Sequence, residues 1–150
     1  MVKYGIIILR YAFILKQIMS TEKPKKIYDL EERTAKFGEN IIDFAKRVPK
    51  NEITRPLIVQ LVKSGTSVGS NYCEADCAES RKDFEHKIGI SKKEAKESKH
   101  WLRMIVKAVP ETGKEARELW KEANELQLIF ISIVKKSRAN SVNQKEKMEI

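Results

Sequence analysis

The chain is poor in the residues that build metal centres, disulfide frameworks and tight turns. Its 150 residues include two cysteines and two histidines, while glycine and proline together number ten. A structural zinc site takes four ligands, and on one helix the two histidines would lie about 21 Å apart, so we expect no metal and no cofactor. The scarcity of glycine and proline favours ordinary folded helix over a fibre or a disordered chain. No catalytic motif stands out, and no stretch predicts a β-strand.

Long hydrophobic runs are also missing, apart from one near the start. Residues 4–15 are apolar except for Gly5 and Arg10. Twelve helical residues reach about 18 Å, short of the ~30 Å hydrocarbon layer, and no cleavage site of small residues follows. Because Met19 begins a polar stretch, we expect residues 1–27 to be a leader, either disordered or not translated before Met19. We expect a cytoplasmic protein in which Cys73 and Cys77 are reduced, small, buried or half-buried residues, with a regulatory disulfide as the alternative.

What the chain does have is helical periodicity, clearest between residues 80 and 108. Apolar and small residues there recur at alternating spacings of four and three, which places them on one face of a helix. They are Phe84, Ile88, Ser91, Ala95, Ser98, Leu102, Ile105 and Val109. The same spacing predicts helices over residues 30–47, 54–78 and 114–137, with Asp29 and Thr54 as caps of the first two. We therefore predict an all-α domain at residues 28–137, an antiparallel up-down-up-down four-helix bundle, followed by a polar, frayed tail at residues 138–150.

The middle of the second predicted helix is poor helix sequence. Residues 64–70 read Ser-Gly-Thr-Ser-Val-Gly-Ser, which by propensity alone indicates a loop. The two glycines suggest a phosphate-binding loop, but the lysine that should follow the second one is absent. Wound into a helix, the same small residues would let the backbone of a partner helix come close. Asn71 and Glu74 then fall on or beside the packed face, where we expect a buried polar pair, with Lys63 or Arg81 as partner of Glu74.

Residues 60–75 resemble the second helix of a family of small bacterial four-helix-bundle proteins. These proteins were first noted as reading frames inside intervening sequences of 23S ribosomal RNA genes. Residues 80–102 are similar to the third helix of that family, and the likeness covers about residues 28–137. The resemblance implies an antiparallel bundle that assembles into a ring, commonly a homopentamer, with no known enzymatic activity. Relatives include the basic, pentameric accessory protein of diversity-generating retroelements, which works with a reverse transcriptase and nucleic acid.

The main candidate for function is a line of basic residues beside the apolar face of the third predicted helix. The formal net charge of the chain is +9, and residues 81–110 contribute nine bases against four acids. The line spans about 22 Å, enough to meet several phosphates of RNA or DNA without reading sequence. The candidate nucleic-acid-binding residues are Lys92, Lys96, Lys99, Arg103 and Lys107, extended by Lys63, Arg81 and Lys82 if neighbouring helix ends converge. The alternative is that these cations pair with acids on a neighbouring helix or subunit; no aromatic residues alternate with them to offer a stacking platform.

A second candidate surface is apolar. Trp101, Trp120, Ile131 and Val134 lie just off the packed faces of the last two predicted helices. They indicate either a wide core or a subunit interface, and ring assembly in the family favours the interface. We expect a non-enzymatic homo-oligomer that binds RNA or DNA, in which a reverse transcriptase or another protein is a possible partner. The competing class is a protein-interaction scaffold.

An enzymatic alternative depends on Arg81 and His86. An arginine followed by a histidine at this spacing resembles the motif of helical-bundle, metal-independent ribonucleases. On a helix the two side chains diverge by about 140°, and short patterns of this kind arise easily in a basic chain. We therefore expect no catalysis.

Overall fold

The computed structural model describes residues 29–148, so the expected leader and the proposed start at Met19 lie outside the described residues. Four α-helices follow one another: α2 (Leu30–Arg47), α3 (Thr54–Asp76), α4 (Arg81–Ala108) and α5 (Gly113–Met148). A single 3₁₀ turn, η1 (Pro110–Thr112), joins the last two. There is no strand between residues 29 and 148, and the predicted all-α four-helix fold is confirmed.

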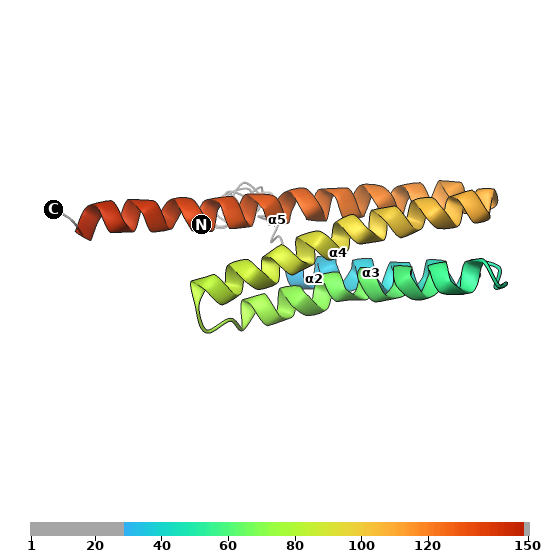
Figure 1. Ribbon diagram of the computed structural model, residues 1–150, viewed down its shortest axis with the longest axis horizontal. Helices are drawn as coiled ribbons and strands as arrows, with labels where there is room; N and C mark the ends of the chain where they lie inside the picture. The colour runs from blue at the N-terminus through green and yellow to red at the C-terminus, as the bar shows by residue number, and fades with distance from the viewer. Residues whose placement is uncertain (1–28, 149–150) are drawn as a thin grey trace, which may run out of the picture.

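Contacts between the helices show that consecutive helices run antiparallel (Figure 1). Across α3 and α4, Ser64 meets Ser98 while Val68 meets Ser91, so one helix ascends as the other descends. Across α2 and α5, Arg33 meets Glu122 and Arg47 meets Glu115. Each helix packs on its two neighbours in the ring α2–α3–α4–α5, with α2 and α5 in the loosest contact. This is the up-down-up-down arrangement.

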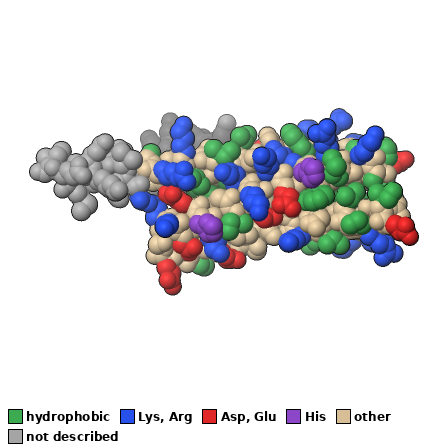
Figure 2. Space-filling model, viewed as in Figure 1, with side chains coloured by type: hydrophobic (Ala, Val, Ile, Leu, Met, Phe, Trp, Pro, Cys, Tyr) green, Lys and Arg blue, Asp and Glu red, His purple; other side chains and the backbone are tan. Residues whose placement is uncertain are grey.

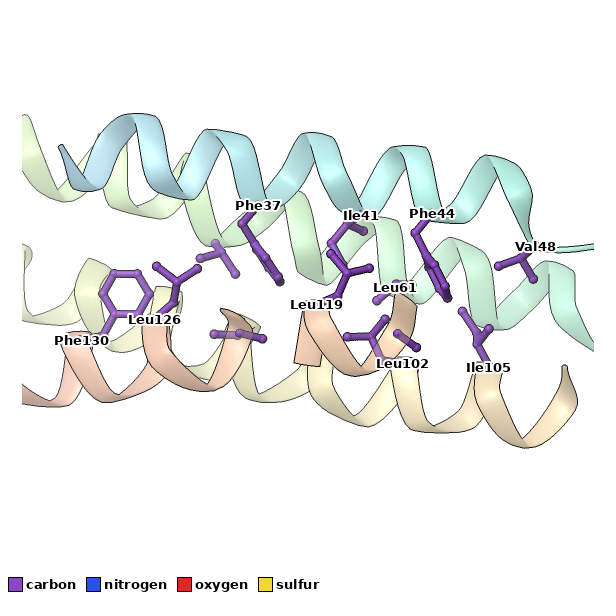
Figure 3. Close-up of a cluster of buried hydrophobic side chains, with 14 of the residues drawn as sticks. Phe37, Ile41, Phe44, Val48, Leu61, Leu102, Ile105, Leu119, Leu126 and Phe130 are labelled. Carbon is purple, nitrogen blue, oxygen red and sulfur yellow. The ribbon is translucent and has the colours of Figure 1, made fainter. Parts of the chain in front are cut away.

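The core is a column of apolar side chains supplied by all four helices (Figure 3). Phe37, Ile41 and Phe44 of α2 point toward Leu119 and Leu126 of α5, and all but Leu119 are at most 1% exposed. Every member of the predicted α4 face is buried or, at its two ends, packed against this core. None of the described helices is long and apolar enough to cross a membrane.

The Ser/Gly tract of α3 is fully helical, as its alternative reading required. A Cβ atom placed on Gly69 would lie 3.3 Å from the backbone carbonyl carbon of Thr34, and one on Gly38 would lie 3.6 Å from the Cα of Thr66. The glycines therefore allow α2 and α3 to approach backbone to backbone. Tertiary packing along this seam outweighs the weak helix propensity of residues 64–70.

Buried hydroxyl groups in the core all have acceptors. Ser91 of α4 donates to the carbonyl oxygen of Val68 across the seam at 3.1 Å. Ser98 donates to the carbonyl oxygen of Glu94 at 2.9 Å and lies 3.0 Å from the hydroxyl of Ser64. Among the described side chains, no buried polar atom lacks a partner, so the serines at core positions carry no desolvation penalty.

Two helix boundaries differ from the prediction. Thr54 is not the cap of α3: the side chain of Asn51 accepts hydrogen bonds from the backbone amides of Ile53 and Thr54, while Thr54 donates to the carbonyl oxygen of Pro49. The last helix does not end near Ser137 but continues to Met148, because no glycine or proline interrupts residues 114–148. Asp29 does cap α2, accepting from the amide of Glu32 at 3.0 Å.

Three polar expectations at the end of α3 are wrong. Cys73 and Cys77 are exposed, because Ala75 takes the core position between them. Glu74 is also exposed, and its ion-pair partner is Lys87 of α4 rather than Lys63 or Arg81. Asn71 is half-buried and donates to the carbonyl oxygen of Ser67 in its own helix. No buried polar pair forms at this end of α3.

Candidate nucleic-acid interface

The basic line predicted on α4 lies on the flank of that helix that faces α5. We call it the cationic edge: Lys92, Lys96, Lys99, Arg103 and Lys107. Its position is fixed by Lys99, whose Nζ donates to Oδ1 of Asn124 on α5 at 2.8 Å. The other members lie three, four, seven or eight residues away, so they occupy the same flank. Lys92, Lys96, Arg103 and Lys107 are exposed and Lys99 is half-buried.

The antiparallel register brings a row of α5 side chains beside this edge. Two hydrogen bonds fix the register: Lys99 to Asn124, and Ser137 to Glu85 at 2.7 Å. Arg103 is then level with Trp120, and Lys92 is level with Ile131. Figure 2 shows the outcome as blue cationic and green hydrophobic side chains interspersed along the upper part of the molecule. The surface is therefore mixed, with cations on α4 and apolar groups on α5.

Four members of the cationic edge have no acidic partner. Within residues 29–140, no carboxylate lies at ion-pair distance from Lys92, Lys96, Arg103 or Lys107. Burial lowers the pKa of the Lys99 ammonium, and the nearby charge of Lys96 lowers it further. Like charges thus lie close together along the edge without compensation from the same subunit.

The opposite seam, between α2 and α5, shows what compensated cations look like in this protein. Nε of Arg33 donates to Oε1 of Glu122 at 2.6 Å, and its Nη2 reaches both Glu122, at 2.9 Å, and Glu125, at 2.6 Å. The hydrogen bond to Glu122 is the main cause of the raised pKa of Arg33. Arg47 pairs with Glu115 farther along. These pairs bridge an open groove of about 860 Å³ in which carboxylates outnumber cations, so it does not suit an anionic ligand.

The three outlying candidates do not join the edge. Lys63, on α3, lies on the other side of α4, where its charge partly opposes the burial that raises the pKa of Glu94. Arg81 is at the start of α4, with its Nε 3.8 Å from Oε1 of Glu85. Lys82 lines a separate surface pocket of about 460 Å³ together with His86. The helix ends do not converge to extend the cationic edge.

The predicted interface residues occupy two faces rather than one. Trp120, Ile131 and Val134 share one line on α5, where Trp120 is 41% and Ile131 43% exposed and Val134 is half-buried. Trp101 lies on the far flank of α4, where its Nε1 donates to Oε1 of Glu97 at 3.1 Å and its ring meets His100 edge to face. A ring of identical subunits joins two different faces at each contact, so both positions are compatible with such an assembly.

The structure does not assemble a ribonuclease site from Arg81 and His86. The pocket beside His86 is lined by Lys82, Glu85, Lys93 and Arg138, among others, and Arg81 does not line it. No group of three or more His, Cys, Asp or Glu side chains within the described part of the chain could hold a metal ion.

Two residues near the edge were missed from the sequence. Arg117 of α5 lines a pocket with Arg103 and Trp120, and Asn124 anchors Lys99. The Nζ of Lys99 also lies 4.9 Å from the centre of the Trp120 ring. The aromatic group that the basic line lacks along its own helix is therefore supplied by the next one. Only the register between α4 and α5 shows this, and no local pattern encodes it.

Comparison with known proteins identifies the family. Residues 27–132 match the model of the 23S rRNA-intervening sequence protein family. The chain belongs to this family. A similar solved structure is the crystal structure of a protein with unknown function from the S23 ribosomal protein family of Bacteroides thetaiotaomicron. The two sequences are 28% identical, the match covers 70% of this chain and 97% of the other, and the TM-score is 0.62. None of the curated proteins matches this chain.

Proposed function

We propose that this family member binds the sugar–phosphate backbone of RNA or DNA through the cationic edge of α4, without catalysis. The observation that carries the proposal is the contrast between the two sides of α5. Cations on the α2 side are paired with carboxylates, whereas Lys92, Lys96, Arg103 and Lys107 have no acidic partner in the described part of the subunit. A row of exposed cations over about 22 Å matches the spacing of several phosphates.

Charge reversal tests this proposal. The variant Lys96→Glu/Arg103→Glu changes two exposed residues that touch no carboxylate. A matched control, Lys46→Glu/Lys121→Glu, makes the same change in net charge on α2 and the outer side of α5, where only exposed pairs with Asp43 and Glu118 are lost. With a labelled 20-nucleotide strand at low salt, we expect the edge variant to bind at least tenfold more weakly and the control to stay within about threefold. Equal losses in the two variants would contradict the proposal.

We also propose that the protein is a homo-oligomer, with a homopentamer as the expected form. Ile131 supports this, because it is large, apolar and 43% exposed beside the half-buried Val134. Aromatic and aliphatic groups of this kind are typical of subunit interfaces. Light scattering should show a multiple of the 17.4 kDa chain mass that falls in Ile131→Glu. The control Val59→Glu changes an exposed valine on α3, 62% exposed, and should leave the mass unchanged. A monomeric wild-type protein would refute the assembly.

The competing function is a protein-interaction scaffold in which the cationic edge pairs with acids of a neighbouring subunit. The exposed apolar row on α5 favours this reading. Light scattering of the Lys96→Glu/Arg103→Glu variant separates the two functions. If these residues serve assembly, the oligomer dissociates; if they bind phosphate, the mass is unchanged and only the affinity for the strand falls.

A further inference from the structure

At the end of the cationic edge near η1, a pocket of about 250 Å³ opens between α4 and α5. Its floor is apolar, formed by Leu102 and Ala116, which are at most 2% exposed. Its walls carry Arg103 from α4, and Arg117 and Trp120 from α5. A flat apolar floor between two guanidinium groups and an indole is a different environment from the rest of the edge, where the cations face solvent.

The size and chemistry of this pocket select a narrow class of ligand. Pockets for drug-sized molecules have volumes of about 300–1,000 Å³, so 250 Å³ accommodates one planar ring system rather than a whole nucleotide. An indole that is 41% exposed offers a face for stacking. Neither Arg103 nor Arg117 pairs with a carboxylate within residues 29–140, so both guanidinium groups are available to phosphates on either side of a stacked ring.

We propose that this pocket takes one unpaired nucleobase, stacked on Trp120, with the flanking phosphates at Arg103 and Arg117. The inference depends on the proposed function and makes it specific: the ligand is single-stranded, because a paired base cannot enter. Base stacking on an aromatic side chain is strong and tolerant of sequence. Trp120 is eleven residues, about 16 Å, from Ile131 along α5, so a second copy seated on Ile131 leaves the pocket open.

The test uses the full chain with Trp101→Phe, which leaves Trp120 as its only tryptophan. Two probes of equal length and charge are compared at low salt: a 12-nucleotide single strand and an abasic strand. We expect the strand with bases to quench the emission of Trp120 and to bind about tenfold more tightly than the abasic strand. Trp120→Leu should abolish that difference, and Trp120→Phe, which keeps an aromatic face, should retain most of it.

The outcomes separate this inference from the function on which it depends. If both strands bind equally, or if Trp120→Leu keeps the difference between them, the base pocket is wrong and the phosphate-binding function stands. If neither strand binds at low salt, both fail. If Trp120→Leu lowers the oligomer mass, Trp120 belongs to the subunit interface and the pocket is wrong. A mononucleotide that quenches Trp120 as strongly as the strand at equal concentration would overturn the assignment to a strand.

Discussion

Gly65 of α3 faces Ile41 of α2 at a distance that leaves no room for a side chain. A Cβ atom at Gly65 would lie 2.8 Å from both Cγ1 and Cγ2 of Ile41, a residue that is itself fully buried. Such a contact is shorter than van der Waals separation, so either Ile41 or the whole helix would have to move. The close packing of α2 on α3 thus depends on this glycine.

Gly65→Ala should therefore destabilise the protein although alanine is the better helix former. We expect a loss of about 1–3 kcal/mol from overpacking, which exceeds the gain of about 1 kcal/mol in helix propensity. Gly89→Ala on α4 is the matched control, because nothing lies within 4 Å of a Cβ there, and it should stabilise the protein by up to about 1 kcal/mol. Urea unfolding measures both, and a Gly65→Ala protein as stable as wild type would show that the seam is not tightly packed.

The hydroxyl of Ser91 holds α4 to α3 by donating to the carbonyl oxygen of Val68, and Ser91 is fully buried. Ser91→Ala should cost about 1 kcal/mol, because it leaves that buried carbonyl without this donor. Ser70 is exposed and only bonds within its own helix at 3.4 Å, so Ser70→Ala should change stability by less than about 0.5 kcal/mol. The free energy of unfolding of the two variants decides the matter, and equal values would count against an inter-helix role for Ser91.

Glu85 ties α4 to the later part of α5 and gives the protein a pH dependence. The hydrogen bond from Ser137 is the main cause that lowers the pKa of Glu85 below 4.5, and Arg138 adds to it while desolvation opposes it. A carboxyl with a depressed folded-state pKa stabilises the fold above the unfolded value and loses that contribution as the pH falls through the folded value.

Between pH 6 and pH 3, the Tm of the wild type should therefore fall further than the Tm of Glu85→Gln, which has no charge to lose. Thermal unfolding followed by circular dichroism measures both. Parallel Tm curves would mean that the contacts of Glu85 with Ser137 and Arg138 contribute nothing to stability.

Much of the fold was predictable because its signals are local. The four helices follow from spacing by threes and fours, and Asp29 caps α2 through a side chain three residues from its partner. The Ser/Gly tract was the difficult segment, since propensity and periodicity disagree there and only the contact of Gly65 with Ile41 explains why the helix is preferred.

The candidate site was predictable only along α4. The sequence placed Lys92, Lys96, Lys99 and Arg103 on one flank, because residues on one helix have a fixed geometry. It could not place Trp120 and Arg117 beside them, or pair Glu74 with Lys87, because such contacts depend on the register between helices. That register is set by many packing contacts together and by no single motif.

The central claim is that the cationic edge binds phosphates, and the salt dependence of strand binding tests it most directly. The affinity of the wild-type protein for the labelled strand is measured from 50 to 300 mM salt. Because each phosphate contact on a single strand contributes about −0.7 to the slope of log K against log salt, four or five contacts per subunit predict a slope of about −3 to −4. The Lys96→Glu/Arg103→Glu variant should be shallower by more than one unit. No binding at 50 mM salt, or a slope that this variant leaves unchanged, would contradict the account.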